Sequence, residues 1–209
     1  MPNWCENELS VSGPAEELKE FREFANPLSA NKLIPMPEEF KDIETGLTFI
    51  DGVKYTHWRT VEGKAIPVSE EEKKALHEKY GACHAIDWAH MNWGTIWDFI
   101  DCKVEEHSNM VVYRFDTAWG PPVPVIENIA EMYPNLSFLF SFGGIEINSS
   151  GSIFYVKGER NLLKHIEYRT GFYVEDLKDL DYNFSDKYSD SLRKAFPEMY
   201  SGTKHVAIE

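Results

Sequence analysis

The sequence has little cysteine and no long apolar run. Its three cysteines, Cys5, Cys83 and Cys102, are an odd number at wide spacing, which argues against a disulfide framework and against a CxxC metal site. We therefore expect reduced thiols in the core. No segment approaches the roughly 18 apolar residues of a membrane span. Residues 1–6 lack the basic and apolar parts of a secretion leader, so we expect a cytoplasmic protein without membrane contact.

Basic side chains are also scarce. Lys and Arg total 21 against 35 Asp and Glu, which gives a formal net charge of −14. Such a charge repels phosphate and disfavours direct nucleic-acid binding. The carboxylates are spread along the chain, as they are where acidity serves solubility. The G-x-S-x-G, Walker A and G-x-G-x-x-G patterns do not occur, which removes the common hydrolase and nucleotide-binding signatures.

Hydrophobic periodicity predicts an α+β fold. Alternating residues indicate strands at 4–12, 99–106, 110–119, 136–142 and 152–157, and 3.6-residue spacing indicates helices at 14–25 and 120–133. Residues 31–91 follow no single period and look like an insertion, with a helix capped by Ser69 and a short one at 83–91. The order is that of a ferredoxin-like split β-α-β sandwich, with an antiparallel sheet, helices on one face and an added edge strand. We expect this domain over residues 1–160 and a helical C-terminal extension over 161–209, with helices near 162–168 and 189–196.

This topology brings distant segments to one end of the sheet. The starts of the first and second strands and the end of the third meet there, and the turn after the fourth strand arrives beside them. We call the candidate site at this end the tryptophan corner. Its members are Asn3, Trp4, Asn92, Trp93, Trp97, Asp98, Asp116, Thr117, Trp119 and Glu146.

The corner allows a functional and a structural interpretation. As a binding site, indoles would supply area while amides and carboxylates fix orientation. As structure, the same indoles would plug the end of the sheet. Asp98 and Asp116 could also act as acid and base.

The chain offers a candidate metal site at Cys83, His84, Asp87 and His90. Positions 84, 87 and 90 point in diverging directions on a helix, so three ligands would not converge. We therefore expect no metal and no cofactor.

Three motifs occur in order along the chain: Asn3-Trp4-Cys5-Glu6-Asn7, Asn92-Trp93-Gly94-Thr95 with Trp97-Asp98, and Thr117-Ala118-Trp119 with Pro121-Pro122. Together they resemble the YubB ferredoxin-like domain family, whose members are borne on phages, plasmids and related mobile elements. The resemblance implies a ferredoxin-like fold and a bacterial mobile-element setting, and no established activity. Ile96 stands where that family tends to have Lys, and Gly120 where it tends to have Ser.

Three hypotheses of function follow. The first is a non-catalytic accessory protein that binds another protein or a small ligand through the tryptophan corner. The second is an acidic decoy that occupies a host DNA-binding protein, which requires carboxylates aligned along one face. The third is a small acid/base enzyme that uses Asp98 and Asp116. No oligomeric state follows from the sequence.

Overall fold

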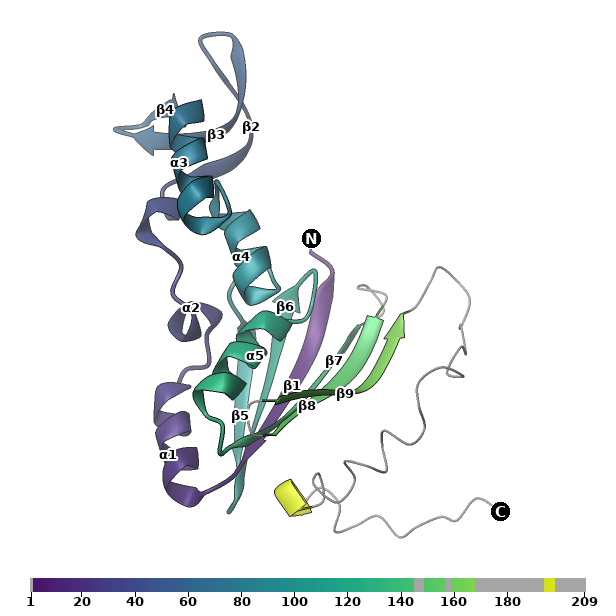
Figure 1. The fold of residues 1–209 in the computed structure, drawn as a ribbon. Coiled ribbons are helices and arrows are strands. Elements are labelled where there is room, and N and C mark those ends of the chain that lie inside the picture. The colour runs from purple at the N-terminus through teal and green to yellow at the C-terminus, as the bar shows by residue number, and fades with distance from the viewer. Residues whose placement is uncertain (1, 145–148, 157–158, 168–193, 198–209) are drawn as a thin grey trace.

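The computed structural model describes residues 2–144, 149–156, 159–167 and 194–197 (Figure 1). Its main sheet has six strands in the order β5-β6-β1-β7-β8-β9. Counted along the chain, the first four strands of this sheet take the spatial order 4-1-3-2, with every pairing antiparallel, which is the ferredoxin-like arrangement. The predicted α+β ferredoxin-like fold is confirmed. The strands are β1 (Trp4–Ser12), β5 (Ile100–Glu106), β6 (Met110–Ala118), β7 (Ser137–Gly144), β8 (Ser149–Val156) and β9 (Glu159–Glu167).

Two helices cover one face of this sheet, as predicted: α1 (Ala15–Phe24) and α5 (Val123–Met132) (Figure 1). Alternate residues of β1, with Leu9 and Val11 fully buried, face these helices. Phe21 of α1 packs edge-on against Phe138, with ring centroids 5.5 Å apart. Among the described residues, no helix is both long and apolar enough to cross a membrane.

The end of the chain corrects one prediction. The expected helix at 162–168 is instead strand β9, which pairs antiparallel with β8, so two strands rather than one extend the sheet. The local helix propensity of this segment is overridden because β8 would otherwise be an edge strand, and β9 forms backbone hydrogen bonds with its unpaired N–H and C=O groups. The segment predicted as a helical extension therefore begins inside the sheet. Most of the helix expected at 189–196 lies outside the described residues.

The region of the expected insertion holds a second sheet that the sequence did not predict. Strands β2, β3 and β4 pair in that order and project away from the main sheet (Figure 1). The expected helix after Ser69 is present, and the Ser69 hydroxyl accepts from the N–H of Glu72 at 3.1 Å. The elements are α2 (Ala30–Leu33), η1 (Glu38–Phe40), β2 (Glu44–Ile50), β3 (Val53–Val61), β4 (Lys64–Pro67), α3 (Glu70–Tyr80) and α4 (Ala85–Trp93).

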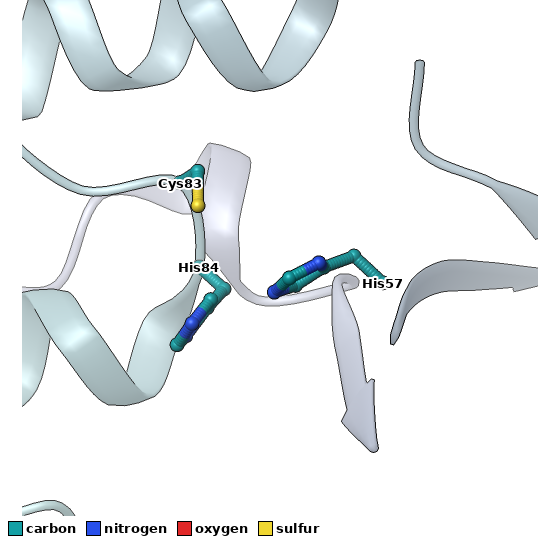
Figure 2. Close-up of side chains that lie close together, drawn as sticks. All are labelled: His57, Cys83 and His84. Atoms are coloured by element: carbon teal, nitrogen blue, oxygen red, sulfur yellow. The ribbon is translucent and has the colours of Figure 1, made fainter. Parts of the chain in front are cut away.

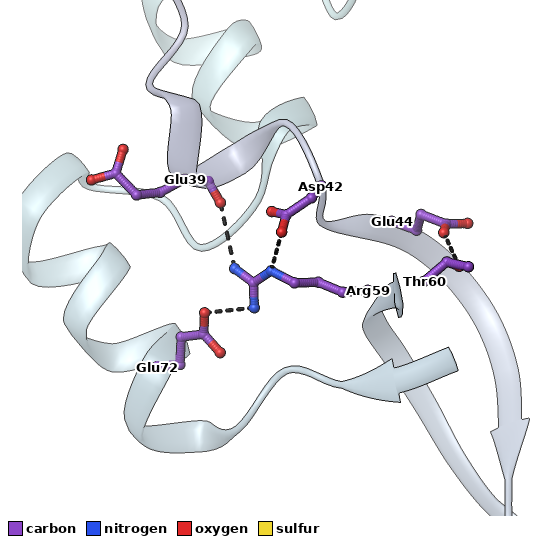
Figure 3. A network of polar contacts seen from close by, with 6 residues as sticks. All are labelled: Glu39, Asp42, Glu44, Arg59, Thr60 and Glu72. Carbon is purple, nitrogen blue, oxygen red and sulfur yellow. Dashed lines mark hydrogen bonds and ion pairs between the residues drawn. The ribbon is translucent and has the colours of Figure 1, made fainter. Parts of the chain in front are cut away.

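Arg59 of β3 joins the second sheet to its neighbours (Figure 3). Its guanidinium donates to Asp42 at 2.8 Å and lies 2.6 Å from Glu72 of α3. It also reaches the carbonyl of Glu39 at 3.5 Å. One planar side chain thereby connects η1, the following loop and α3, a geometry that suits the fork of arginine donors.

Candidate functional site

The predicted meeting of segments at the tryptophan corner is present. Trp4 pairs with Ala118 across β1 and β6, and the N–H of Trp119 donates to the carbonyl of Asn3 at 2.8 Å. The segment before β5 closes the corner through Thr95, whose hydroxyl donates to the Ala118 carbonyl at 2.9 Å and accepts from its N–H at 3.1 Å. Hydrogen bonds to backbone groups thus join three segments that are remote in sequence.

The inner half of the corner is packed. Trp93 is only 4% exposed, and its indole N–H donates to the carbonyl of Ile34 at 2.8 Å. Its ring meets Trp88 edge-on at 5.6 Å. Asn92 donates to the Trp88 carbonyl within α4. These two predicted site residues have a structural role, because the side-chain amide of Asn92 and the indole N–H of Trp93 both donate to backbone carbonyls.

Asp98 also has a structural task. One carboxylate oxygen accepts from the Ser29 hydroxyl at 2.6 Å, and the other accepts from the N–H groups of Ala30 and Phe99 at 2.5 and 2.8 Å. The carboxylate therefore holds the start of α2 against the start of β5. This occupation counts against Asp98 as a general acid or base.

Thr117 belongs to a buried polar network that the sequence did not predict. Asn7 donates to the Thr117 hydroxyl at 2.9 Å and to the Cys5 carbonyl at 2.8 Å, and Thr117 donates to the Gly120 carbonyl at 2.8 Å. Burial raises the pKa of the Cys5 thiol to about 11, so this cysteine stays protonated and unreactive. The amide of Asn7 at an inward strand position was the signal for the network.

The outer half of the corner is open. Trp97 is 48% exposed and Trp119 is 51% exposed. The Trp97 ring lies 6.3 Å from that of half-buried Trp4. Trp119 also has a φ of +72°, a left-handed conformation that is uncommon for a bulky residue and costs free energy. Glu146, the remaining predicted member, lies outside the described residues.

A groove of about 630 Å³ lies on the sheet face opposite α1 and α5, and its wall includes Glu6, which is two residues along β1 from Trp4. Trp4 and Glu6 point to the same side of β1, and Glu6 lies directly across from Asp116 of β6. The groove was not predicted as a site. Its walls carry four carboxylates and two basic side chains, with Glu6, Glu8, Asp101, Asp116, Lys103 and Arg114 beside Ser141 and Gly143.

The charges of the groove are unequally compensated. Arg114 donates to Glu8 at 2.7 Å and to Glu105 at 2.9 Å. The pKa of the Asp116 carboxyl is raised, first by burial and then by the negative charges of Glu6 and Asp101. The end of the groove nearest the corner therefore carries excess negative charge that a cation would relieve.

Asp116→Asn should stabilise the protein at neutral pH. Because the pKa of Asp116 is raised in the folded state, the protonated carboxyl stabilises the fold fully below the unfolded pKa, and this contribution is lost as pH rises through the folded pKa. At neutral pH the charged carboxylate is unfavourable in the fold, and the neutral amide of asparagine removes that cost. We expect a gain of up to about 0.5 kcal/mol at pH 7 that disappears near pH 3. Urea titration at both pH values measures it. Asp42→Asn, which removes a partner of Arg59, should destabilise at pH 7, and a loss for Asp116→Asn as well would contradict the electrostatic account.

A match to a family model agrees with this fold. Residues 92–185 match a family model described as a ferredoxin-like domain in Api92-like protein. A crystal structure of protein api92 from Yersinia pseudotuberculosis aligns with a TM-score of 0.48 and 10% identity, covering 83% of this chain and 100% of that one. No curated protein matches the sequence. The matched family is ferredoxin-like and has no assigned activity. The resemblance to YubB proteins and the mobile-element setting stay predictions.

Proposed function

We propose that the protein is a non-catalytic interaction module that binds another protein through the outer half of the tryptophan corner and the acidic groove beside it. In keeping with the resemblance of its motifs, its setting would be an accessory role in a phage- or plasmid-type element. The observation that carries the proposal is the exposure of Trp97 and Trp119 at the same end of the sheet as the groove.

Exposed indoles are the side chains that most often anchor protein interfaces. Tryptophan supplies a large apolar area and a polar N–H at low conformational cost, and it is enriched among residues that dominate binding energy. In the inner half of the corner, the side-chain donors of Asn92 and Trp93 are already hydrogen-bonded to backbone carbonyls. Binding is therefore assigned to the outer half, where Trp97 and Trp119 are exposed. The hydrogen bonds of Asp98 likewise favour binding over acid/base chemistry.

The charge of the groove points to a cationic segment of the partner. Lys or Arg side chains could pair with Glu6 and Asp116 and pack over Trp97, where the face of the indole attracts a cation. A cation there would lower the electrostatic cost that raises the pKa of Asp116. Such an interface would weaken as salt increases.

The test is a comparative pull-down from a bacterial host lysate. We expect proteins retained by the wild-type chain to be lost when Trp97→Ala and Trp119→Ala are combined. Truncating such anchors costs at least about 2 kcal/mol of binding, roughly a thirtyfold loss of affinity. Asp116→Asn should weaken retention while leaving the protein folded.

Phe49→Ala is the matched control, because Phe49 is an aromatic residue that is 66% exposed on the distant strand β2. It should retain the same partners as the wild type. Circular dichroism of each variant verifies that the fold is intact. Retention of the same proteins by the double tryptophan variant would overturn the proposal.

A further inference from the structure

Two histidines and a cysteine converge within the insertion. His57 comes from β3, whereas Cys83 and His84 precede α4, and Figure 2 shows the three side chains lying close together. One ligand atom of each lies within 4.8 Å of the others. Tetrahedral zinc with bonds of about 2.0–2.3 Å places its ligand atoms roughly 3.5 Å apart, so small side-chain shifts would complete the geometry.

We propose that His57, Cys83 and His84 form a binding site for a zinc-class divalent ion. One thiolate and two imidazoles are a donor set that suits Zn²⁺, whereas Mg²⁺ and Ca²⁺ require oxygen ligands. The sequence offered Cys83, His84, Asp87 and His90 as candidate ligands in this region. The structure replaces the helical His90 with His57 from the other sheet.

The surroundings orient both imidazoles. The Thr56 hydroxyl lies 3.0 Å from Nδ1 of His57, and a bond there leaves Nε2 of His57 free for a metal. Nδ1 of His84 accepts the N–H of Asp87 at 3.2 Å, and the carboxylate of Asp87 lies 2.9 Å from Nε2 of the same ring. For His84 to bind the ion through Nδ1, the bond from the Asp87 N–H must open, while the carboxylate at Nε2 keeps the ring oriented. The two rings stack with centroids 4.7 Å apart.

Partial burial suits such a site. All three side chains are half-buried, so an ion can enter from solvent while its ligands are held by the surrounding chain. Cys83 differs in this from Cys5, which lies within the core.

The ion would link strand β3 of the second sheet to the segment before α4. His57 and Arg59 lie on the same side of β3, and Arg59 already joins that strand to α3. The metal would add a second connection, from β3 to the start of α4. Because the folded chain holds the ligands together and the unfolded chain does not, binding should stabilise the fold.

Cobalt titration of the metal-free full-length chain tests the site. We expect one equivalent of Co²⁺ to give a thiolate-to-cobalt charge-transfer band and the strong visible bands of tetrahedral coordination, both displaced by Zn²⁺. Zinc should also raise the thermal midpoint and slow the reaction of one cysteine with a thiol reagent. Absence of the charge-transfer band in the wild-type chain overturns the proposal.

Variants assign the ligands. Cys83→Ala should abolish the charge-transfer band, and His57→Ala should abolish the thermal shift by zinc. Cys102→Ala and His90→Ala provide matched controls outside the cluster and should behave as the wild type. If Cys83→Ala keeps the band, or if His90→Ala removes the thermal shift as His57→Ala does, the assignment of ligands is wrong.

Discussion

Trp93→Ala is expected to destabilise the protein by about 3–5 kcal/mol, which is the usual cost of truncating a large buried aromatic residue. The side chain is 4% exposed and packs edge-on against Trp88. Its removal also leaves the carbonyl of Ile34 without its indole donor, since that bond is 2.8 Å long. Because native domains are stable by only about 5–15 kcal/mol, the loss should be evident in urea titration followed by circular dichroism.

Trp97→Ala is the matched control for this prediction. Trp97 lies four residues along the same motif but is 48% exposed, so its truncation should change the free energy of unfolding by about 0.5 kcal/mol or less. The two variants should also separate in binding, because Trp97 belongs to the proposed interface. Similar losses of stability for both would contradict the division of the corner into a packed and an open half.

Much of the main sheet could be predicted from the sequence, because one of its faces is buried. Alternation along residues 4–12 and 110–119 predicted β1 and β6 almost residue for residue, since a slip by one position would expose Leu9 and Val11. Proline and glycine then located α1 and α5. The order of these elements predicted that the segments around Trp4, Thr95 and Trp119 meet at the tryptophan corner, whereas the turn with Glu146 lies outside the described residues.

The second sheet could not be predicted in the same way. Its strands have little buried apolar surface, and Leu47, Phe49 and Val53 are exposed, so no clean alternation marks an inner face. Arg59 holds this sheet by ion pairs instead. His57 could not be connected with Cys83 and His84, because only the pairing of β2, β3 and β4 sets its position.

The corner itself shows why a motif does not reveal the role of each residue. Trp93 ends α4 and turns inward, whereas Trp97 follows the helix and stays exposed. The sequence gives both the same residue type within one short stretch. What separates them is the reversal of the chain at Gly94, where the helix ends in a left-handed conformation with φ of +80°.

Gly94→Ala should accordingly be among the most damaging small substitutions in the protein. An alanine pays about 1–2 kcal/mol for the left-handed conformation. Its added Cβ would also lie 2.7 Å from the carbonyl oxygen of Pro121 and 2.7 Å from the ring of Pro124, where α5 begins. Overpacking of this kind adds about 1–3 kcal/mol. Urea titration should therefore show a loss of about 2–5 kcal/mol in total.

Gly63→Ala separates the two contributions. Gly63 has nearly the same backbone conformation, with φ of +78°, but nothing lies within 4 Å of an added Cβ. It should lose only the conformational part, about 1–2 kcal/mol. The excess loss at Gly94 then measures how strongly the close approach of α4 to α5 is required. Equal losses at the two positions would mean that the end of α4 can move away from Pro121, and that Thr95 and Trp97 are not held in place by this contact.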